Sequence, residues 1–144
     1  MKKQIREKVF ETNSSSSHSI TIEPSNDGLY DTIIPDDDGN IILTGGEFGW
    51  GIEEHNDALT KANYCGVDNL LNEDKLDMLK EVIREQTGCN EVIIDISEDW
   101  KDSNHSYIDH QSHGTSREAL ESKETLRQFI FNKNSILYID NDNH

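Results

Sequence analysis

The sequence predicts an α+β fold in a single domain over residues 1–144, with about three helices and a mixed, mostly antiparallel sheet. Short β-branched runs and segments of helical periodicity occur along the chain without a regular βαβ order. The chain of 144 residues has the length of one ordinary domain, and its 33% of hydrophobic residues are enough for a modest core.

Strand signals dominate the first third of the chain. Alternating apolar and polar residues from Ile20 to Glu23 predict a half-buried strand. Two β-prone runs, 30–34 and 40–44, flank the sequence Pro-Asp-Asp-Asp-Gly, and its Asp38-Gly39 step suits the positive φ angles of a tight turn. We therefore expect an antiparallel hairpin around Asp38-Gly39.

A glycine-rich stretch follows at residues 44–51. Its spacing, G-G-x-x-G-x-G, matches neither the P-loop nor the dinucleotide-binding pattern. It predicts a turn-rich segment in which Phe48 and Trp50 cover the core. Helical periodicity then begins near Glu53 and stops at Gly66, a residue type that is common just after a helix end.

Two further helices are expected in the second half of the chain. Asn72 is a suitable N-cap for residues 73–87, whose apolar stripe faces the core and whose end precedes Gly88. The last helix is expected over residues 117–131. β-Branched runs predict strands at residues 91–96, in the centre of the sheet, and at residues 135–139.

Charge limits the partners that the protein can have. The chain carries 29 acidic and 13 basic residues, a formal net charge of −16. Such a charge repels nucleic acid and anionic membranes and attracts basic proteins. We therefore expect no direct nucleic-acid binding and no membrane anchoring.

The number and spacing of the cysteines indicate the cellular compartment of the protein. Cys65 and Cys89 form no C-x-x-C pair, and no apolar segment of the secretory type precedes them. We expect two free thiols in a reducing cytoplasm.

Two polar clusters combine histidine with hydroxyl groups. The first is FETNSSSSHSI at residues 10–20, and the second is HSYIDHQSH at residues 105–113. In VFETNSSSSHS, in the IDHQS stretch and in the late FIFN segment, the chain resembles a group of short, functionally unassigned proteins encoded by bacteriophages. The resemblance implies a phage origin, and hence the cytoplasm of an infected bacterial cell, but no particular chemistry.

The clusters have the composition of a ligand-binding site. Hydroxyl, amide and imidazole groups, with the backbone N–H groups of a loop, can jointly bind phosphate, ribose or carbonyl oxygen atoms. We expect a folded loop and a pocket shared by both clusters, with Arg117, Arg127 and Lys133 available to an anionic ligand. The predicted ligand-binding residues are Asn13, Ser15, Ser16, Ser17, His18, His110 and Ser112.

Metal-binding and catalytic patterns are incomplete. The residues with metal-ligating side chains in the second cluster are His105, Asp109, His110 and His113. They lie on an irregular segment that does not fix their geometry, so neither a metal nor another cofactor is expected. His110-Gln111-Ser112 fits half of the H-x-[ST] pair of two-histidine phosphoesterases, whereas the threonine after His18 lies one residue too far along. No G-x-S-x-G elbow is present. These gaps favour binding and leave turnover open.

Three function classes remain. The first is a phage accessory protein, such as an anti-defence protein, that binds a nucleotide-like or other polar small ligand at the Ser/His loop. The second is an acidic DNA mimic that inhibits a basic host nucleic-acid-binding protein. The third is a histidine-dependent phosphoesterase or transferase acting through His18 and His110. The sequence favours the first class, because the polar clusters are localised whereas the acidic residues are spread along the chain.

Overall fold

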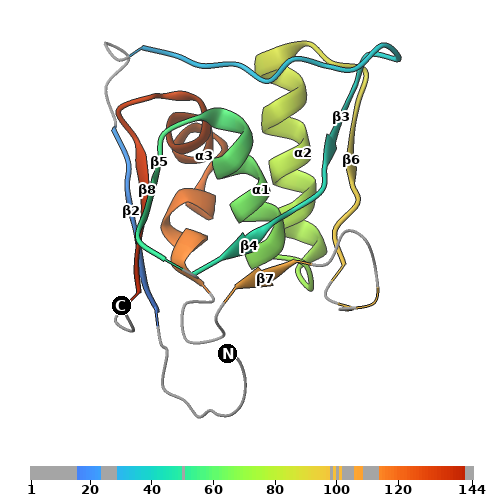
Figure 1. Ribbon diagram of the computed structural model, residues 1–144. Coiled ribbons are helices and arrows are strands. Elements are labelled where there is room, and N and C mark those ends of the chain that lie inside the picture. The colour runs from blue at the N-terminus through green and yellow to red at the C-terminus, as the bar shows by residue number, and fades with distance from the viewer. Residues whose placement is uncertain are drawn as a thin grey trace.

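A computed structural model describes residues 16–23, 29–49, 51–97, 99, 101, 106–108 and 114–141. Its helices lie in the middle of the molecule, between an antiparallel sheet on one side and a parallel pair of strands on the other (Figure 1). This arrangement confirms the predicted α+β class. Within the described part of the chain, no helix has the length and apolar character needed to cross a bilayer.

The strands form three small sheets. Strand β8 (Ile136–Asn141) lies between β2 (Ser16–Thr21) and β5 (Glu53–His55) in an antiparallel sheet. The other two sheets are parallel pairs, β3 (Asn40–Leu43) with β6 (Glu91–Ile94) and β4 (Glu47–Phe48) with β7 (Tyr107–Ile108). The strand predicted at residues 91–96 therefore exists, but it belongs to a two-stranded sheet and not to the centre of a larger one.

Helix α2 (Glu73–Thr87) is confirmed together with both of its predicted ends. The Asn72 side chain accepts a hydrogen bond from the Lys75 N–H at 3.3 Å, which satisfies an otherwise unpaired donor of the first turn. Gly88 follows the last turn with a φ of 74°, a left-handed conformation that glycine adopts without strain. The predicted apolar stripe is buried at Leu79, Val82 and Ile83.

Helix α1 (Ala58–Asp68) differs from its prediction at both ends. The segment near Glu53 pairs with β8 as strand β5, so the helix begins only after Asp57, whose carboxylate accepts a hydrogen bond from the Thr60 N–H at 2.9 Å. Gly66 lies inside the helix, where an added Cβ atom would stand 2.8 Å from the Cδ1 atom of Ile96. The predicted start and end are wrong because strand pairing and close packing decide them.

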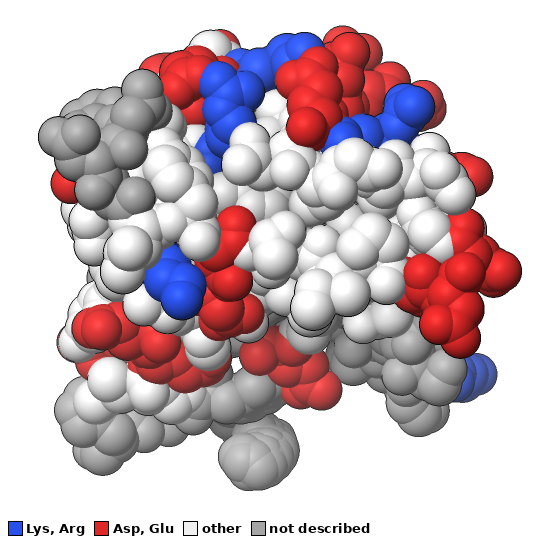
Figure 2. Space-filling model, turned by 90° about the horizontal axis from the view of Figure 1, so that it is seen from above, with Lys and Arg blue, Asp and Glu red and all other residues white. Residues whose placement is uncertain are grey.

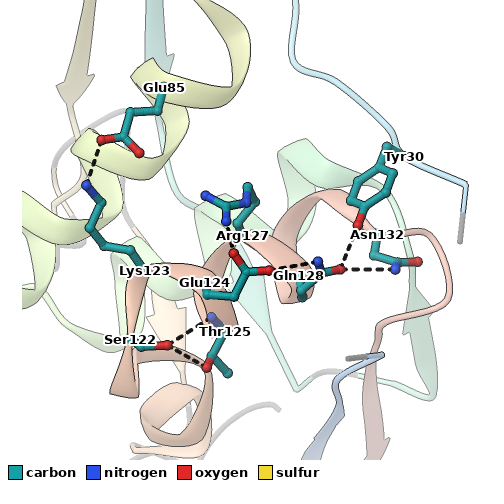
Figure 3. A network of polar contacts seen from close by, with 9 residues as sticks. All are labelled: Tyr30, Glu85, Ser122, Lys123, Glu124, Thr125, Arg127, Gln128 and Asn132. Carbon is teal, nitrogen blue, oxygen red and sulfur yellow. Dashed lines mark hydrogen bonds and ion pairs between the residues drawn. The ribbon is translucent and has the colours of Figure 1, made fainter. Parts of the chain in front are cut away.

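The helix predicted at residues 117–131 is interrupted. A 3-10 helix, η2 (Thr115–Glu121), precedes α3 (Lys123–Phe131), and Ser122 between them is extended. The Ser122 hydroxyl accepts a hydrogen bond from the Thr125 N–H at 3.0 Å and so caps α3 (Figure 3).

The predicted hairpin does not form, although its turn does. Gly39 has a φ of 82°, and its N–H donates to the Asp36 carbonyl at 2.9 Å. The arm before the turn is held by α3. The Asp31 N–H donates to the last carbonyl of that helix at 2.7 Å, and the Tyr30 hydroxyl donates to the amide oxygen of Gln128 at 2.9 Å (Figure 3). Contacts with α3 thus override the local hairpin signal, and β3 pairs with β6 instead.

A buried lysine ties α1 to the turn after α3. The Lys61 ammonium donates to the backbone carbonyls of Asn132 at 2.9 Å and of Ser135 at 2.8 Å. Burial lowers the pKa of Lys61 to about 8, although the charges of Asp57 and Asp31 act in the opposite direction. Both carbonyls lie at the junction between α3 and β8, so this side chain joins three elements.

We expect the protein to gain stability with rising pH relative to a Lys61→Met variant. The unfolded chain keeps the lysine proton up to its ordinary pKa of 10.5, whereas the folded chain releases it near 8, so the unfolded state binds more protons between these values. The free energy of unfolding of the parent minus that of the variant should increase by about 1 kcal/mol between about pH 7 and 9, as measured by urea denaturation. Lys133→Met, at an exposed lysine, should follow the parent at both pH values. A flat difference for Lys61→Met would contradict the lowered pKa.

Candidate functional site

The last two serines of the run and His18 lie on strand β2, which pairs with β8 from Ser16 to Thr21. The loop predicted for Ser16, Ser17 and His18 is therefore wrong, because strand pairing begins four residues before Ile20. Successive side chains of a strand point to opposite faces, and accordingly Ser17 is exposed whereas His18 is half-buried. A ligand on the face of His18 would not meet the side chain of Ser17.

His18 and Thr115, which comes just after the second polar cluster, both contact the buried hydroxyl group of Tyr64. Its Nδ1 atom lies 2.7 Å from the Tyr64 hydroxyl oxygen, and the two ring centroids are 5.8 Å apart. Burial raises the pKa of the Tyr64 phenol well above its ordinary value, although a side-chain hydrogen bond with Thr115 lowers it. The phenol therefore stays protonated, so it can donate one hydrogen bond and accept the other.

Thr115 comes two residues after His113, the last residue of the second cluster, so the Tyr64 hydroxyl links the first cluster to the chain just beyond the second. The other predicted site residues, Asn13, Ser15, His110 and Ser112, and the metal-ligating candidates His105, Asp109 and His113 lie outside the described residues. The shared pocket of His18 and His110 thus stays a prediction.

The turn at Gly114–Ser116 is fixed by the C-terminal end of α1. The Asp68 carboxylate accepts hydrogen bonds from the Gly114 N–H at 2.8 Å and from the N–H and hydroxyl of Ser116 at 3.0 and 2.5 Å. Asp68 follows Tyr64 by four residues, so both side chains lie on one face of the helix. Side chains on one face of α1 therefore fix the backbone at the start of η2.

A cavity of about 300 Å³ opens beside this turn, where the end of α1, the start of α2 and η2 meet. Its charged walls are Lys75, Arg117 and Asp68. The Lys75 ammonium donates to the Leu120 carbonyl at 2.9 Å. Arg117 is exposed, and its guanidinium makes no hydrogen bond or ion pair with any residue that the structure describes. The remaining walls are Asn69, Leu71, Asn72, Gly114 and Leu120.

The cavity suits an anionic group of a small ligand. Its volume is at the lower end of the range for small-molecule sites, which is enough for a phosphate and part of what it carries. Arg117 presents a planar set of N–H donors, and Lys75 has donors beyond the one directed at Leu120. The Asp68 carboxylate is engaged by three donors of the Gly114–Ser116 turn, so its acceptor capacity is directed at the protein.

Cys65 is not suited to act as a nucleophile. Cys65 and Cys89 are free, as predicted, and both are buried. Burial raises the pKa of the Cys65 thiol far above its ordinary value, so the thiolate is not populated near neutral pH. Cys65 is therefore a core residue.

The glycine-rich segment is structural where it is described. The Gly45 N–H donates to the Asn63 side chain at 2.8 Å, and the Gly46 N–H donates to the Ser106 hydroxyl at 3.0 Å. Phe48 is buried edge-on against Tyr64, with ring centroids 4.9 Å apart. These donors are satisfied within the protein and do not form a phosphate cradle, while Trp50 lies outside the described residues.

His18 and Arg117 were predictable from the sequence as candidate site residues, whereas Tyr64, Asp68 and Lys75 were not. The four-residue spacing of Tyr64 and Asp68 places them on one helix face, which was the available signal. That spacing is common in helices, and it gives no indication of the segments that the two side chains contact.

No protein-family model, curated protein sequence or solved structure matches the chain. The function therefore has to be inferred from the site itself.

We expect Tyr64→Phe to lower the free energy of unfolding by about 1–3 kcal/mol, because it removes a buried hydroxyl shared by His18 and Thr115. Tyr138→Phe is the matched control, since this tyrosine is 39% exposed on β8. It should change the free energy of unfolding by less than about 0.5 kcal/mol. Chemical denaturation of the two variants makes the comparison, and equal effects would show that the shared hydroxyl has no special importance.

Proposed function

We propose that the protein binds a small phosphate-bearing, nucleotide-like ligand at the cavity between α1, α2 and η2. The observation that carries this proposal is the presence of Lys75 and Arg117 at one cavity of a chain whose net charge is −16. A field of that sign repels an anion at long range, so binding has to rely on short-range donors in defined positions. Two neighbouring cations supply charge-assisted hydrogen bonds of this kind.

We propose that the second polar cluster extends the site, because Gly114 in the cavity wall directly follows this cluster in the sequence. Gly114 and Thr115 follow directly on the second cluster, and Thr115 shares the Tyr64 hydroxyl with His18. In this proposal Lys75 and Arg117 hold the phosphate, while His110 and Ser112 bind the sugar or base. Imidazole and hydroxyl groups provide the donors and acceptors that a base edge or a ribose needs.

Sequestration of the ligand, rather than its turnover, is the activity we propose. The buried and protonated Cys65 gives no support to a cysteine nucleophile. The resemblance to phage-encoded proteins supports an accessory role in the cytoplasm of an infected bacterium, where the ligand would be a nucleotide-like signal of host defence.

An acidic DNA mimic is the second candidate, and the net charge of −16 favours it. On the face in Figure 2, however, the acidic side chains gather in separate groups around a broad area without charged side chains. A mimic of DNA needs regularly spaced charges along a continuous path. The cavity with its two cations therefore supports ligand binding better than this face supports mimicry.

We expect at least one phosphate ligand to bind, and Arg117→Gln and Lys75→Gln each to weaken it by about tenfold or more, because each removes a charged hydrogen bond. The probes are nucleoside mono-, di- and triphosphates, cyclic dinucleotides and inorganic phosphate, titrated by calorimetry. Lys133→Gln removes the same charge from an exposed lysine that does not line the cavity, and it should keep the affinity of the parent.

A further variant, His110→Ala, separates the parts of the site. It should weaken nucleotide binding and leave binding of inorganic phosphate unchanged. No binding of any probe at millimolar concentration, or equal losses in Arg117→Gln and Lys133→Gln, would show that the cavity is not a ligand site.

A further inference from the structure

The two arms of the predicted hairpin diverge beyond their turn and leave a groove between them. The Asp36 N–H donates to the Asn40 carbonyl at 2.8 Å and closes the turn. Next to this pair lies a cavity of about 240 Å³. Its apolar walls are Ile33, Ile34, Ile41, Ile42 and Leu59. The groove thus lies between residues 33–36 and strand β3, beside the start of α1.

Both arms of the groove are held in place from outside it. The Asp31 carboxylate accepts a hydrogen bond from the Ala58 N–H at 2.8 Å, and the Asp31 N–H donates to the last carbonyl of α3. The other arm, β3, pairs with β6. Because each arm also has partners outside the groove, the groove exists before any ligand arrives, and binding costs little ordering of the protein.

The groove combines exposed apolar side chains with an open strand edge. Ile34 is 84% exposed, and Leu59 and Ile42 are 46% and 43% exposed. Strand β3 has β6 on one edge, and no other strand among the described residues pairs with its second edge. At the start of this second edge the N–H and carbonyl of Asn40 are both bonded to Asp36, so the open part of the edge begins after Asn40. An open edge beside an apolar cavity is what strand addition requires, since the edge supplies backbone hydrogen bonds and the cavity accepts a side chain.

The acidic side chains around the groove favour a basic partner. Asp36, Asp37 and Asp38 are exposed at the turn that joins the two arms. Figure 2, which views the molecule from above, shows a broad area without charged side chains that is bordered by several groups of acidic side chains and by fewer Lys and Arg side chains. A partner segment that carries Lys or Arg next to an apolar side chain would complement this pattern. A second copy of the chain does not, because it would bring another acidic turn and a further net charge of −16 to the surface.

We propose that this groove binds an extended segment of a partner protein in which apolar residues alternate with Lys or Arg. The segment adds as a further strand to the edge of β3 beyond Asn40, whose own backbone groups are bonded to Asp36. One of its apolar side chains enters the cavity beside Ile34 and Leu59, and its basic side chains lie near Asp37 and Asp38. This site is separate from the cationic cavity and does not depend on the function proposed for it.

A fluorescent ten-residue peptide that alternates valine with lysine is the probe, and fluorescence anisotropy measures its binding. We expect saturable binding that Ile34→Gln weakens by about tenfold or more, because an apolar contact is lost at a side chain too exposed to affect folding. Ile52→Gln is the matched control, since this isoleucine is 60% exposed and lines neither cavity. It should keep the affinity of the parent.

Two altered peptides test the charge and the backbone pairing separately. Glutamate in place of lysine should abolish binding, and so should N-methylation of every second backbone amide in the register that faces β3. The proposal would be overturned if the peptide did not bind at millimolar concentration or if the glutamate peptide bound equally well. It would also be overturned if binding were insensitive to Ile34→Gln, or to N-methylation in both registers. Analytical ultracentrifugation tests the other occupant, because a dimer that Ile34→Gln dissociates would mean that a second copy fills the groove.

Discussion

The arrangement of the helices depends on the buried ammonium group of Lys61. A charge removed from water needs hydrogen-bond acceptors, and the carbonyls of Asn132 and Ser135 provide them, with the Phe129 ring centroid 5.6 Å away. Ser135 is engaged further, since its hydroxyl donates to the Gln128 carbonyl at 2.8 Å. One side chain of α1 thereby fixes that helix against α3 and against the start of β8, the central strand of the antiparallel sheet.

With α1 fixed, its two ends become the places where distant segments meet. At the C-terminal end, Tyr64 contacts His18 and Thr115, and Asp68 holds the turn beside the cationic cavity. At the N-terminal end, Asp31 accepts a hydrogen bond from the Ala58 N–H and Leu59 lines the apolar groove. The helix has 11 residues and is therefore about 16 Å long. The two proposed sites are built on one rigid element yet lie far enough apart to be occupied independently.

The fold was predictable from the sequence wherever the deciding contacts are local. Both ends of α2 are set by residues at those ends, Asn72 through its side chain and Gly88 through its backbone angles, so the prediction holds to the residue. The hairpin fails because Asp31 gains hydrogen bonds to α1 and α3, partners that the pattern around Asp38-Gly39 does not encode. At the candidate site, His18 was predictable from its residue type and its unusual neighbours. Tyr64 was not, because its importance comes from contacts with segments far away in the sequence.

Net charge acts in opposite directions on the two proposed sites. A charge of −16 attracts a basic segment at long range, so the field of the whole protein assists the groove, and the exposed aspartates at its turn only have to refine the contact. The same field opposes an anion, so the proposed ligand would depend on Lys75 and Arg117 at contact distance, where local donors can outweigh distant carboxylates. One acidic protein can therefore have both proposed sites, because the net charge acts at long range and the cationic side chains act at contact distance. Salt screens the long-range field more than it screens contacts within a cavity, and the groove alone draws its attraction from that field.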